Sequence, residues 1–424
     1  MTSAEEAQQL LRQGRIREAE HAFQRVLEAD PHHVQALNVI ALGALRSGQL
    51  ERARALLERA LAATSGDPIT HHHLGQVLEA QGNFAAAADA QRRAIELAPE
   101  LHVARLHLGR SLEQMGRGEE ALLAYAAALK GAQDAGRWLN PASTPPALKP
   151  LVEHAVVQVR DGRRARFARL FEPLLKAYGR DSLSRVETAL RIYLNEEARE
   201  YTDPRQQPSF LYFPGLPASA YLPRQLFPWA ERLEQATGDI RGELLALLPS
   251  AAGRERVFTS EALEEVNLRG LDVAPTWNGY YFYRHGERRE ENCERCPKTV
   301  AALESLPLSR VREHGPEVLY SVFTPGTHLL PHRGVTNTRL VAHLPLMIPE
   351  ECALNVGGEL HQWQEGRLVV FDDTYEHEAW NRSKKTRVVM IFDIWNPYLT
   401  EAERAALADL IGAIGDFRHA VEAA

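Results

Sequence analysis

Three absences limit what this 424-residue chain can be. It has only three cysteines, too few for a disulfide framework, which indicates a reducing compartment. No stretch approaches the roughly 20 apolar residues that cross a bilayer, and the opening MTSAEEAQQLLRQ lacks the basic start and apolar run of a signal peptide. A basic excess is also missing, since the net charge is −7, so composition favours neither nucleic acid nor anionic membrane as a partner. We therefore expect a cytoplasmic protein without a membrane span.

Aromatic residues are scarce as well, at 7% of the chain, and they gather after residue 200. Hydrophobic residues make up 45% and charged residues 25%, the balance of an ordinary globular protein. The length allows two or three domains. The uneven distribution of aromatics indicates that the two halves of the chain differ in kind.

The first part of the chain is a repeat with a period of 34 residues. Glycines and alanines keep this period through four units, at Gly14, Gly48, Gly82 and Gly116 and at Ala19, Ala53, Ala87 and Ala121. Each glycine stands between two helical patterns, where a positive φ angle ends the first helix. The pattern resembles tetratricopeptide repeats over about residues 3–132. This resemblance implies a helical superhelix whose concave face binds a peptide or protein.

The period fails after these repeats, and the composition then changes twice. We predict a first domain at residues 1–132, a helical connector at residues 133–203 and a second domain at residues 204–424. The second domain begins with a proline-rich arm, RQQPSFLYFPGLPASAYLPRQLF. Its Cys293 and Cys296 form a lone CxxC, for which an ordinary loop is favoured over a zinc or redox site because no second pair supplies the remaining ligands.

Six short runs rich in β-branched and aromatic residues follow between turn residues. They read EVLYSVFT, TRLVAHLPLMI, CALNVGGELHQW, GRLVVFDD, EHEAWN and TRVVMIFDIW. Strands of this length and spacing predict a sandwich or barrel, and a double-stranded jelly roll is the best candidate. The fold class is thus a helical repeat array followed by a jelly-roll domain.

Alternation along two of these strands places polar groups on one face. One set contains Arg387, Val389, Ile391 and Asp393, and another contains Arg339, Val341 and His343. An inward-facing set of this kind offers guanidinium and imidazole groups to an anion.

Two histidines in polar turns suggest an oxygen-activating iron site. A jelly roll that holds Fe(II) usually carries two histidines and a carboxylate, with the carboxylate two residues after the first histidine. Here His332 is followed at that distance by Gly334, which has no side chain, and His377 comes later in DDTYEHEAW. If the site holds iron, the protein supplies two ligands and water or substrate fills the third position.

At this point the sequence resembles a known family. The segments PGTHLLPHRGVTNTRLVAHLPL, FDDTYEHEAWN and TRVVMIFDIWNP are similar to the catalytic domain of aspartyl/asparaginyl β-hydroxylases, which are Fe(II)- and 2-oxoglutarate-dependent oxygenases that lack the triad carboxylate. The resemblance implies Fe(II), 2-oxoglutarate and O2 as cofactors, with His332 and His377 as iron ligands. It further implies that Asp372 or Asp373 holds an iron-bound water or a ligand histidine.

The same resemblance assigns the cosubstrate and substrate contacts. Arg387 is the salt-bridge partner of the 2-oxoglutarate C5 carboxylate, helped by the Ser321 hydroxyl, because a planar guanidinium grips a carboxylate through two hydrogen bonds. His343 contacts the other end of the cosubstrate near the metal, and Arg339 faces a substrate carboxylate or amide. The family often has a second arginine where this chain has Val341.

The activity implied is hydroxylation of an unactivated carbon, the β-carbon of Asp or Asn in a peptide or protein that the repeats present. Three alternatives stay open. The chain could halogenate, because Gly334 leaves room for chloride, or it could hydroxylate a small molecule or a lipid acyl chain. It could also be an inactive adaptor. The remaining histidines are interpreted as surface, packing or supporting residues: His71, His72, His73, His285, His328 and His361.

Overall fold

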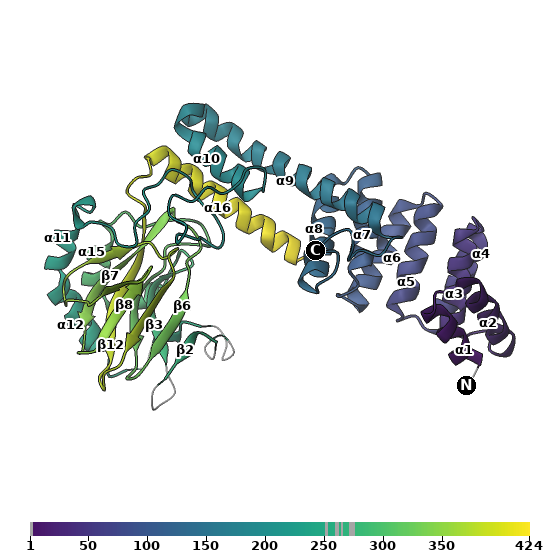
Figure 1. Cartoon of the computed structure of the whole chain (residues 1–424), viewed down its shortest axis with the longest axis horizontal. Coiled ribbons are helices and arrows are strands. Elements are labelled where there is room, and N and C mark those ends of the chain that lie inside the picture. The colour runs from purple at the N-terminus through teal and green to yellow at the C-terminus, as the bar shows by residue number, and fades with distance from the viewer. Residues whose placement is uncertain (1–2, 251–252, 259–262, 264–265, 271–275) are drawn as a thin grey trace. The chain divides into compact units, whose positions relative to one another are not determined.

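The computed structural model describes residues 3–250, 253–258, 263, 266–270 and 276–424 (Figure 1). The chain divides into two compact units, Met1–Arg166 with Phe417–Ala424, and Phe167–Asp416. These units are defined by contacts, so the domain boundaries predicted at residues 132 and 203 stay predictions. No helix in the described part of the chain is long and apolar enough to span a membrane.

The first unit is built from four helix pairs. The helices are α1 (Ser3–Arg12), α2 (Ile16–Ala29), α3 (Val34–Arg46), α4 (Leu50–Ala63), α5 (Pro68–Ala80), α6 (Phe84–Leu97), α7 (His102–Gln114) and α8 (Gly118–Asp134). The four periodic glycines lie just after the first helix of each pair, with φ between 72° and 76°. The four periodic alanines are buried in the second helices. The predicted repeat is therefore confirmed, with the glycines as left-handed helix stops.

Further helices follow the repeats. They are α9 (Lys149–Tyr178), α10 (Arg180–Tyr193) and α16 (Glu401–Glu422), while the second unit adds the short helices η1 (Arg224–Leu226), α11 (Ala230–Gln235), α12 (Thr237–Leu247), α14 (Glu290–Arg295) and α15 (Pro297–Leu303).

The rest of the second unit is two antiparallel sheets. The larger has the order β1-β3-β5-β12-β7-β10 with β4 beside β3, and the smaller has the order β2-β6-β11-β8-β9. The strands are β1 (Arg254–Arg256), β2 (Leu268–Arg269), β3 (Trp277–Arg284), β4 (Glu287–Arg288), β5 (Val318–Phe323), β6 (His328–His332), β7 (Arg339–Met347), β8 (Cys352–Val356), β9 (Glu359–His361), β10 (Val369–Phe371), β11 (His377–Asn381) and β12 (Arg387–Trp395). A helical repeat array followed by an antiparallel β domain confirms the predicted fold class.

The two faces of the larger sheet have different neighbours. One face packs with the short helices, where Ile240 and Leu244 of α12 join Tyr320 and Leu340 in one apolar core. The other face meets the smaller sheet, in a second core whose members include Phe323, Val341, Val389, Leu329, Leu354, Val356, Phe371 and Ala379. Side-chain alternation along each strand produces this division. The space between the sheets is where the predicted polar residues point.

The prediction of an ordinary loop for the CxxC pair is wrong. Cys293 lies in α14 and Cys296 caps α15, and both thiols are buried in the core beneath the larger sheet. Burial raises the pKa of both thiols, that of Cys296 to about 12. A buried, protonated thiol is unreactive, so this pair acts as apolar packing.

Candidate active site

The two histidines predicted to bind iron lie side by side on neighbouring strands. His332 is the last residue of β6 and His377 is the first residue of β11, so both belong to strands and not to the turns expected from sequence. The antiparallel register pairs these two positions directly. Their ring centroids are 4.1 Å apart. Strand pairing thus brings together two imidazoles that are far apart in sequence.

Both imidazoles are held in the same orientation by the backbone. His332 Nδ1 donates to the Leu330 carbonyl at 2.8 Å, and His377 Nδ1 donates to the Tyr375 carbonyl at 3.1 Å. These bonds leave each Nε2 unprotonated, which is the form that binds metal. Burial lowers the pKa of both rings, that of His377 to about 3, so both are neutral at neutral pH.

The place of the missing triad carboxylate is occupied by another residue. A Cβ atom added to Gly334 would collide with the carboxylate of Asp373, which comes from the turn before β11. The Gly334 N–H donates to the Asp373 backbone carbonyl at 2.6 Å, and this bond brings the two segments together. Asp373 Oδ1 is buried and has no partner among the described atoms. Its neighbour Asp372 is fully engaged by Gln206 and Thr374.

Arg387 is a buried cation without a described carboxylate partner. It is 1% exposed, and its guanidinium lies between two aromatic rings, 3.9 Å from the Phe323 centroid and 4.6 Å from the Trp363 centroid. Its Nη1 donates to Ser321 Oγ at 3.1 Å, while Nε has no partner among the described atoms. Burial lowers the pKa of Arg387 to about 9. A carboxylate from outside the chain would relieve this unfavourable state.

Two further residues support this anion pocket. Trp277 Nε1 donates to Ser321 Oγ at 2.9 Å and so fixes the hydroxyl that Arg387 contacts. His343 stands between the pocket and the histidine pair, with its ring 5.8 Å from Trp363 and its Nδ1 buried without a partner among the described atoms. Sequence reasoning missed both tryptophans, because a single aromatic residue in a strand or loop is usually core packing.

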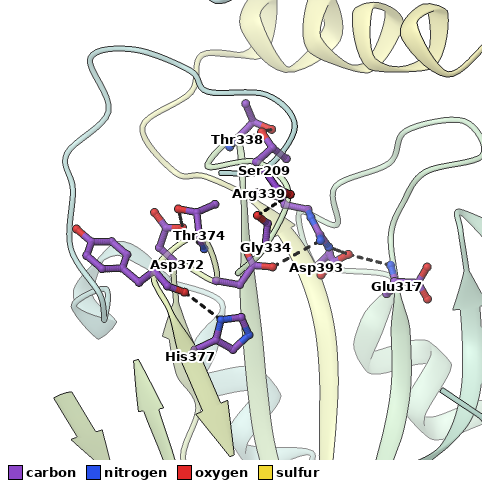
Figure 2. A network of polar contacts seen from close by, with 12 residues as sticks. Ser209, Glu317, Gly334, Thr338, Arg339, Asp372, Thr374, His377 and Asp393 are labelled. Carbon is purple, nitrogen blue, oxygen red and sulfur yellow. Dashed lines mark hydrogen bonds and ion pairs between the residues drawn. The ribbon is translucent and has the colours of Figure 1, made fainter. Parts of the chain in front are cut away.

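Arg339 lies at the other side of the site and is held by acidic residues. Its guanidinium forms an ion pair with Asp393 (Figure 2) and, at 3.6 Å, a second one with Asp373. Burial alone would lower the pKa of Arg339, but these carboxylates raise it. Burial raises the pKa of Asp373 to about 7, although Arg339 opposes that change. Strand alternation in the sequence placed Asp393 on the same face as Arg387, but it did not indicate the ion pair between Asp393 and Arg339.

A cavity of about 450 Å³ connects these groups. All six residues predicted to bind metal, cosubstrate or substrate line it: Ser321, His332, Arg339, His343, His377 and Arg387. Among the other predicted groups, His285 also lines the cavity, whereas His328 pairs with Glu378 at 2.7 Å outside the lining. The structure thus places the predicted residues in one cavity, and their chemical roles stay predictions.

The donor set fits a metal with open coordination positions. Among the described residues, no group of three His, Cys, Asp or Glu side chains is placed to hold a metal ion. Two neutral imidazoles line one cavity with Arg387, which has no carboxylate partner among the described residues. Imidazole nitrogens suit a metal such as Fe(II), with the remaining positions open to other ligands.

Comparisons with known proteins match a hydroxylase family and tetratricopeptide repeats. The family model described as aspartyl/asparaginyl beta-hydroxylase matches residues 234–397, and tetratricopeptide models match residues 5–68 and 68–101. The aspartate beta-hydroxylase domain-containing protein 2 of Rattus norvegicus is 30% identical over 261 residues, 60% of this chain and 73% of that protein. The ornithine lipid ester-linked acyl 2-hydroxylase of Rhizobium tropici is 34% identical over 179 residues, 42% of this chain and 60% of that protein.

One further relative covers both units. The aspartyl/asparaginyl beta-hydroxylase of Homo sapiens is 27% identical over 398 residues, which is 93% of this chain. The chain spans less than half the length of that protein, 42%.

Proposed function

Because the chain belongs to the aspartyl/asparaginyl β-hydroxylase family, we propose that it is an Fe(II)- and 2-oxoglutarate-dependent dioxygenase. It hydroxylates an unactivated carbon, the β-carbon of an Asp or Asn residue in a peptide or protein that the repeats present. The observation that carries the proposal is the pairing of His332 with His377 in one cavity with the buried Arg387, which has no carboxylate partner among the described residues.

His332 and His377 would hold the iron through Nε2. Bound Fe(II) supplies the activation of O2 that is coupled to oxidation of 2-oxoglutarate. The backbone bonds to each Nδ1 keep the rings aimed into the cavity before any metal arrives. Asp373, whose carboxylate fills the space beside Gly334, is placed to accept a hydrogen bond from a water in the third position.

Arg387 and Ser321 would bind the C5 carboxylate of 2-oxoglutarate. The aromatic rings of Phe323 and Trp363 hold the guanidinium plane in place, so little side-chain freedom is lost on binding. His343 lies between this anchor and the metal ligands, where the keto acid end would be. Apolar residues on the same cavity wall exclude bulk water and strengthen these charged contacts.

The position of Asp373 weighs against the halogenase alternative. Chloride in the third metal position would lie beside the Asp373 carboxylate, which occupies the space next to Gly334. A chloride ion next to a carboxylate is unfavourable, since like charges at this range repel. Hydroxylation of a lipid acyl chain stays a second candidate, because the lipid hydroxylase of Rhizobium tropici is 34% identical to this chain.

Peptide or protein presentation by the repeats is a further part of the proposal. Tetratricopeptide models match residues 5–101 in two segments, and arrays of this kind offer a concave surface to extended segments. The experiment is capture of partners on the full chain, followed by mass spectrometry for the gain of one oxygen atom at Asp or Asn.

The metal and cosubstrate roles are tested with variants. We expect His377→Ala to lose anaerobic Fe(II) binding and Arg387→Ala to lose 2-oxoglutarate binding by calorimetry, and both to lose succinate formation. His328→Ala is the matched control, because this histidine lies on the same sheet but pairs with Glu378 outside the cavity lining. Full succinate formation by either active-site variant would refute the assignment. Absence of Fe(II) binding by the wild type would instead favour the inactive adaptor.

A further inference from the structure

The end of the cavity that is remote from Arg387 is lined by acidic residues. Arg387 and Asp393 are both on β12 and both line the cavity. They are six positions apart, about 20 Å along an extended strand. Glu317, just before β5, lies beside Asp393, because its N–H donates to Asp393 Oδ2 at 3.1 Å and its carbonyl accepts from the Asp393 N–H at 3.1 Å. The cavity thus runs from a buried cation to a pair of acidic residues.

The cations near this end are already paired. Arg339 is shared by Asp393 and Asp373, and Arg284 forms an ion pair with Glu255. No lysine lines the cavity among the described residues. Val341, between Arg339 and His343 on the same face of β7, adds an apolar side chain there. A carboxylate entering this end would therefore meet negative charge, and none of the arginines described here is free to receive it.

Glu317 is held in a fixed position by a strained turn. His285, at the tip of the β3–β4 hairpin, has φ of 52° and is followed by Gly286 at 79°. This left-handed pair directs the His285 N–H at Glu317 Oε1, which it contacts at 2.7 Å, and His285 Nδ1 lies 2.9 Å from the same atom. Both contacts use Oε1. Burial raises the pKa of Glu317 to about 7, the neighbouring Asp393 adds to this increase, and the His285 N–H, Arg339 and Arg284 oppose it.

A second carboxylate in the same cavity also has unused capacity. Asp373 is 5% exposed, lines the cavity, and its Oδ1 has no partner among the described atoms. Figure 2 shows Glu317, Asp393 and Arg339 joined in one polar network. Buried carboxylates are stabilised by cations or hydrogen-bond donors, so this end is built to receive a donor group.

We propose that the substrate brings a cationic group to this end, the side chain of a lysine or arginine beside the hydroxylated residue, and that Glu317 binds it. This proposal rests on the proposed function, because it concerns the substrate of the same cavity. The apolar wall near Val341 would contact the substrate segment between the cation and the reacting carbon. Glu317 thereby selects basic segments and rejects acidic ones.

The test uses two synthetic peptides with a central Asn in an alanine background, one with lysine and one with glutamate beside the Asn. Binding to the full chain loaded with Mn(II) and 2-oxoglutarate is measured by calorimetry. We expect the lysine peptide to bind at least about ten-fold tighter to the wild type. This preference should fall to less than about two-fold in Glu317→Gln. Glu313→Gln is the matched control, because Glu313 is in the preceding turn and outside the cavity lining.

Each outcome of the peptide-binding experiment either supports or overturns the inference. Tighter binding of the glutamate peptide, equal binding of the two, or binding of neither would overturn the inference, as would an unchanged preference in Glu317→Gln. Wild-type binding of Mn(II) and 2-oxoglutarate is measured first on the same samples. If that binding is present while the peptide preference fails, the proposed function stands and only the substrate class is wrong. If that binding is absent, both are wrong.

Discussion

Replacing Arg387 by methionine should remove cosubstrate binding without unfolding the protein. The guanidinium is 1% exposed and has only Ser321 and two aromatic rings as described partners. Arg387→Met removes a buried charge whose burial costs several kcal/mol. It also removes two cation–π contacts of roughly 1–2 kcal/mol each and one charged hydrogen bond of about 1.5–3 kcal/mol. These terms nearly balance, and we expect the ligand-free variant to be as stable as the wild type or about 1 kcal/mol more stable.

The lowered pKa of Arg387 determines how the stability difference between the wild type and Arg387→Met changes with pH. Burial lowers the pKa of Arg387 in the folded protein to about 9, well below that of an unperturbed arginine. Below pH 9 the group is protonated in both states, so the full burial penalty weakens the wild type. As the pH rises above 9, the folded protein loses this proton first and the penalty shrinks. Any stability advantage of Arg387→Met should therefore be largest near neutral pH and diminish by about pH 10.

Two assays check the prediction. Thermal unfolding should show a melting temperature unchanged or raised by about 2–4 °C without ligand. Calorimetry should show 2-oxoglutarate affinity weakened by at least about 30-fold, since a buried carboxylate–guanidinium pair contributes about 2–5 kcal/mol. Arg382→Met is the matched control, because Arg382 stacks 4.5 Å from the Trp380 ring on the surface. A ligand-free loss above about 2 kcal/mol together with normal 2-oxoglutarate affinity would refute the reasoning.

Two further predictions concern neighbours of the site. Gly334→Ala should lower the free energy of unfolding by about 1–3 kcal/mol, because the new methyl group meets Asp373. The loss should be smaller in an Asp373→Ala background, and a double-mutant cycle by thermal unfolding that gives additive losses would contradict this cause. Trp277→Phe should weaken 2-oxoglutarate binding by roughly 3- to 10-fold in calorimetry, because Ser321 loses one hydrogen-bond donor. Unchanged affinity would show that Ser321 does not need this donor.

The repeats could be predicted from sequence because their determinants are local. A left-handed turn residue and a small buried residue each recur at a fixed spacing, so Gly48 and Ala53 can be assigned without knowing any distant contact. Strand alternation is local in the same way. It placed Arg387 and Asp393 on one face of β12, and the structure puts both in the cavity lining.

Contacts between segments could not be predicted in this way. His332 is predicted in a polar turn, yet the run HLLPH forms β6 through pairing with β11. The ring of Trp363 stacks on Arg387 from a segment that follows β9, and no sequence pattern indicates this contact. The same holds for Cys293 and Cys296, whose burial depends on helices packing beneath the larger sheet.

Gly334 shows how the two kinds of information combine at the centre of the site. In the sequence, Gly334 stands at a position where a metal-binding carboxylate is usual, and it has no side chain. In the structure, glycine is required there, because the Asp373 carboxylate occupies the space that any side chain at position 334 would need. The carboxylate at this place therefore comes from Asp373, in the turn before β11, and Arg339 forms an ion pair with it. Restoring a carboxylate at position 334 would place two acids in one space, so the packing with Asp373 requires glycine there.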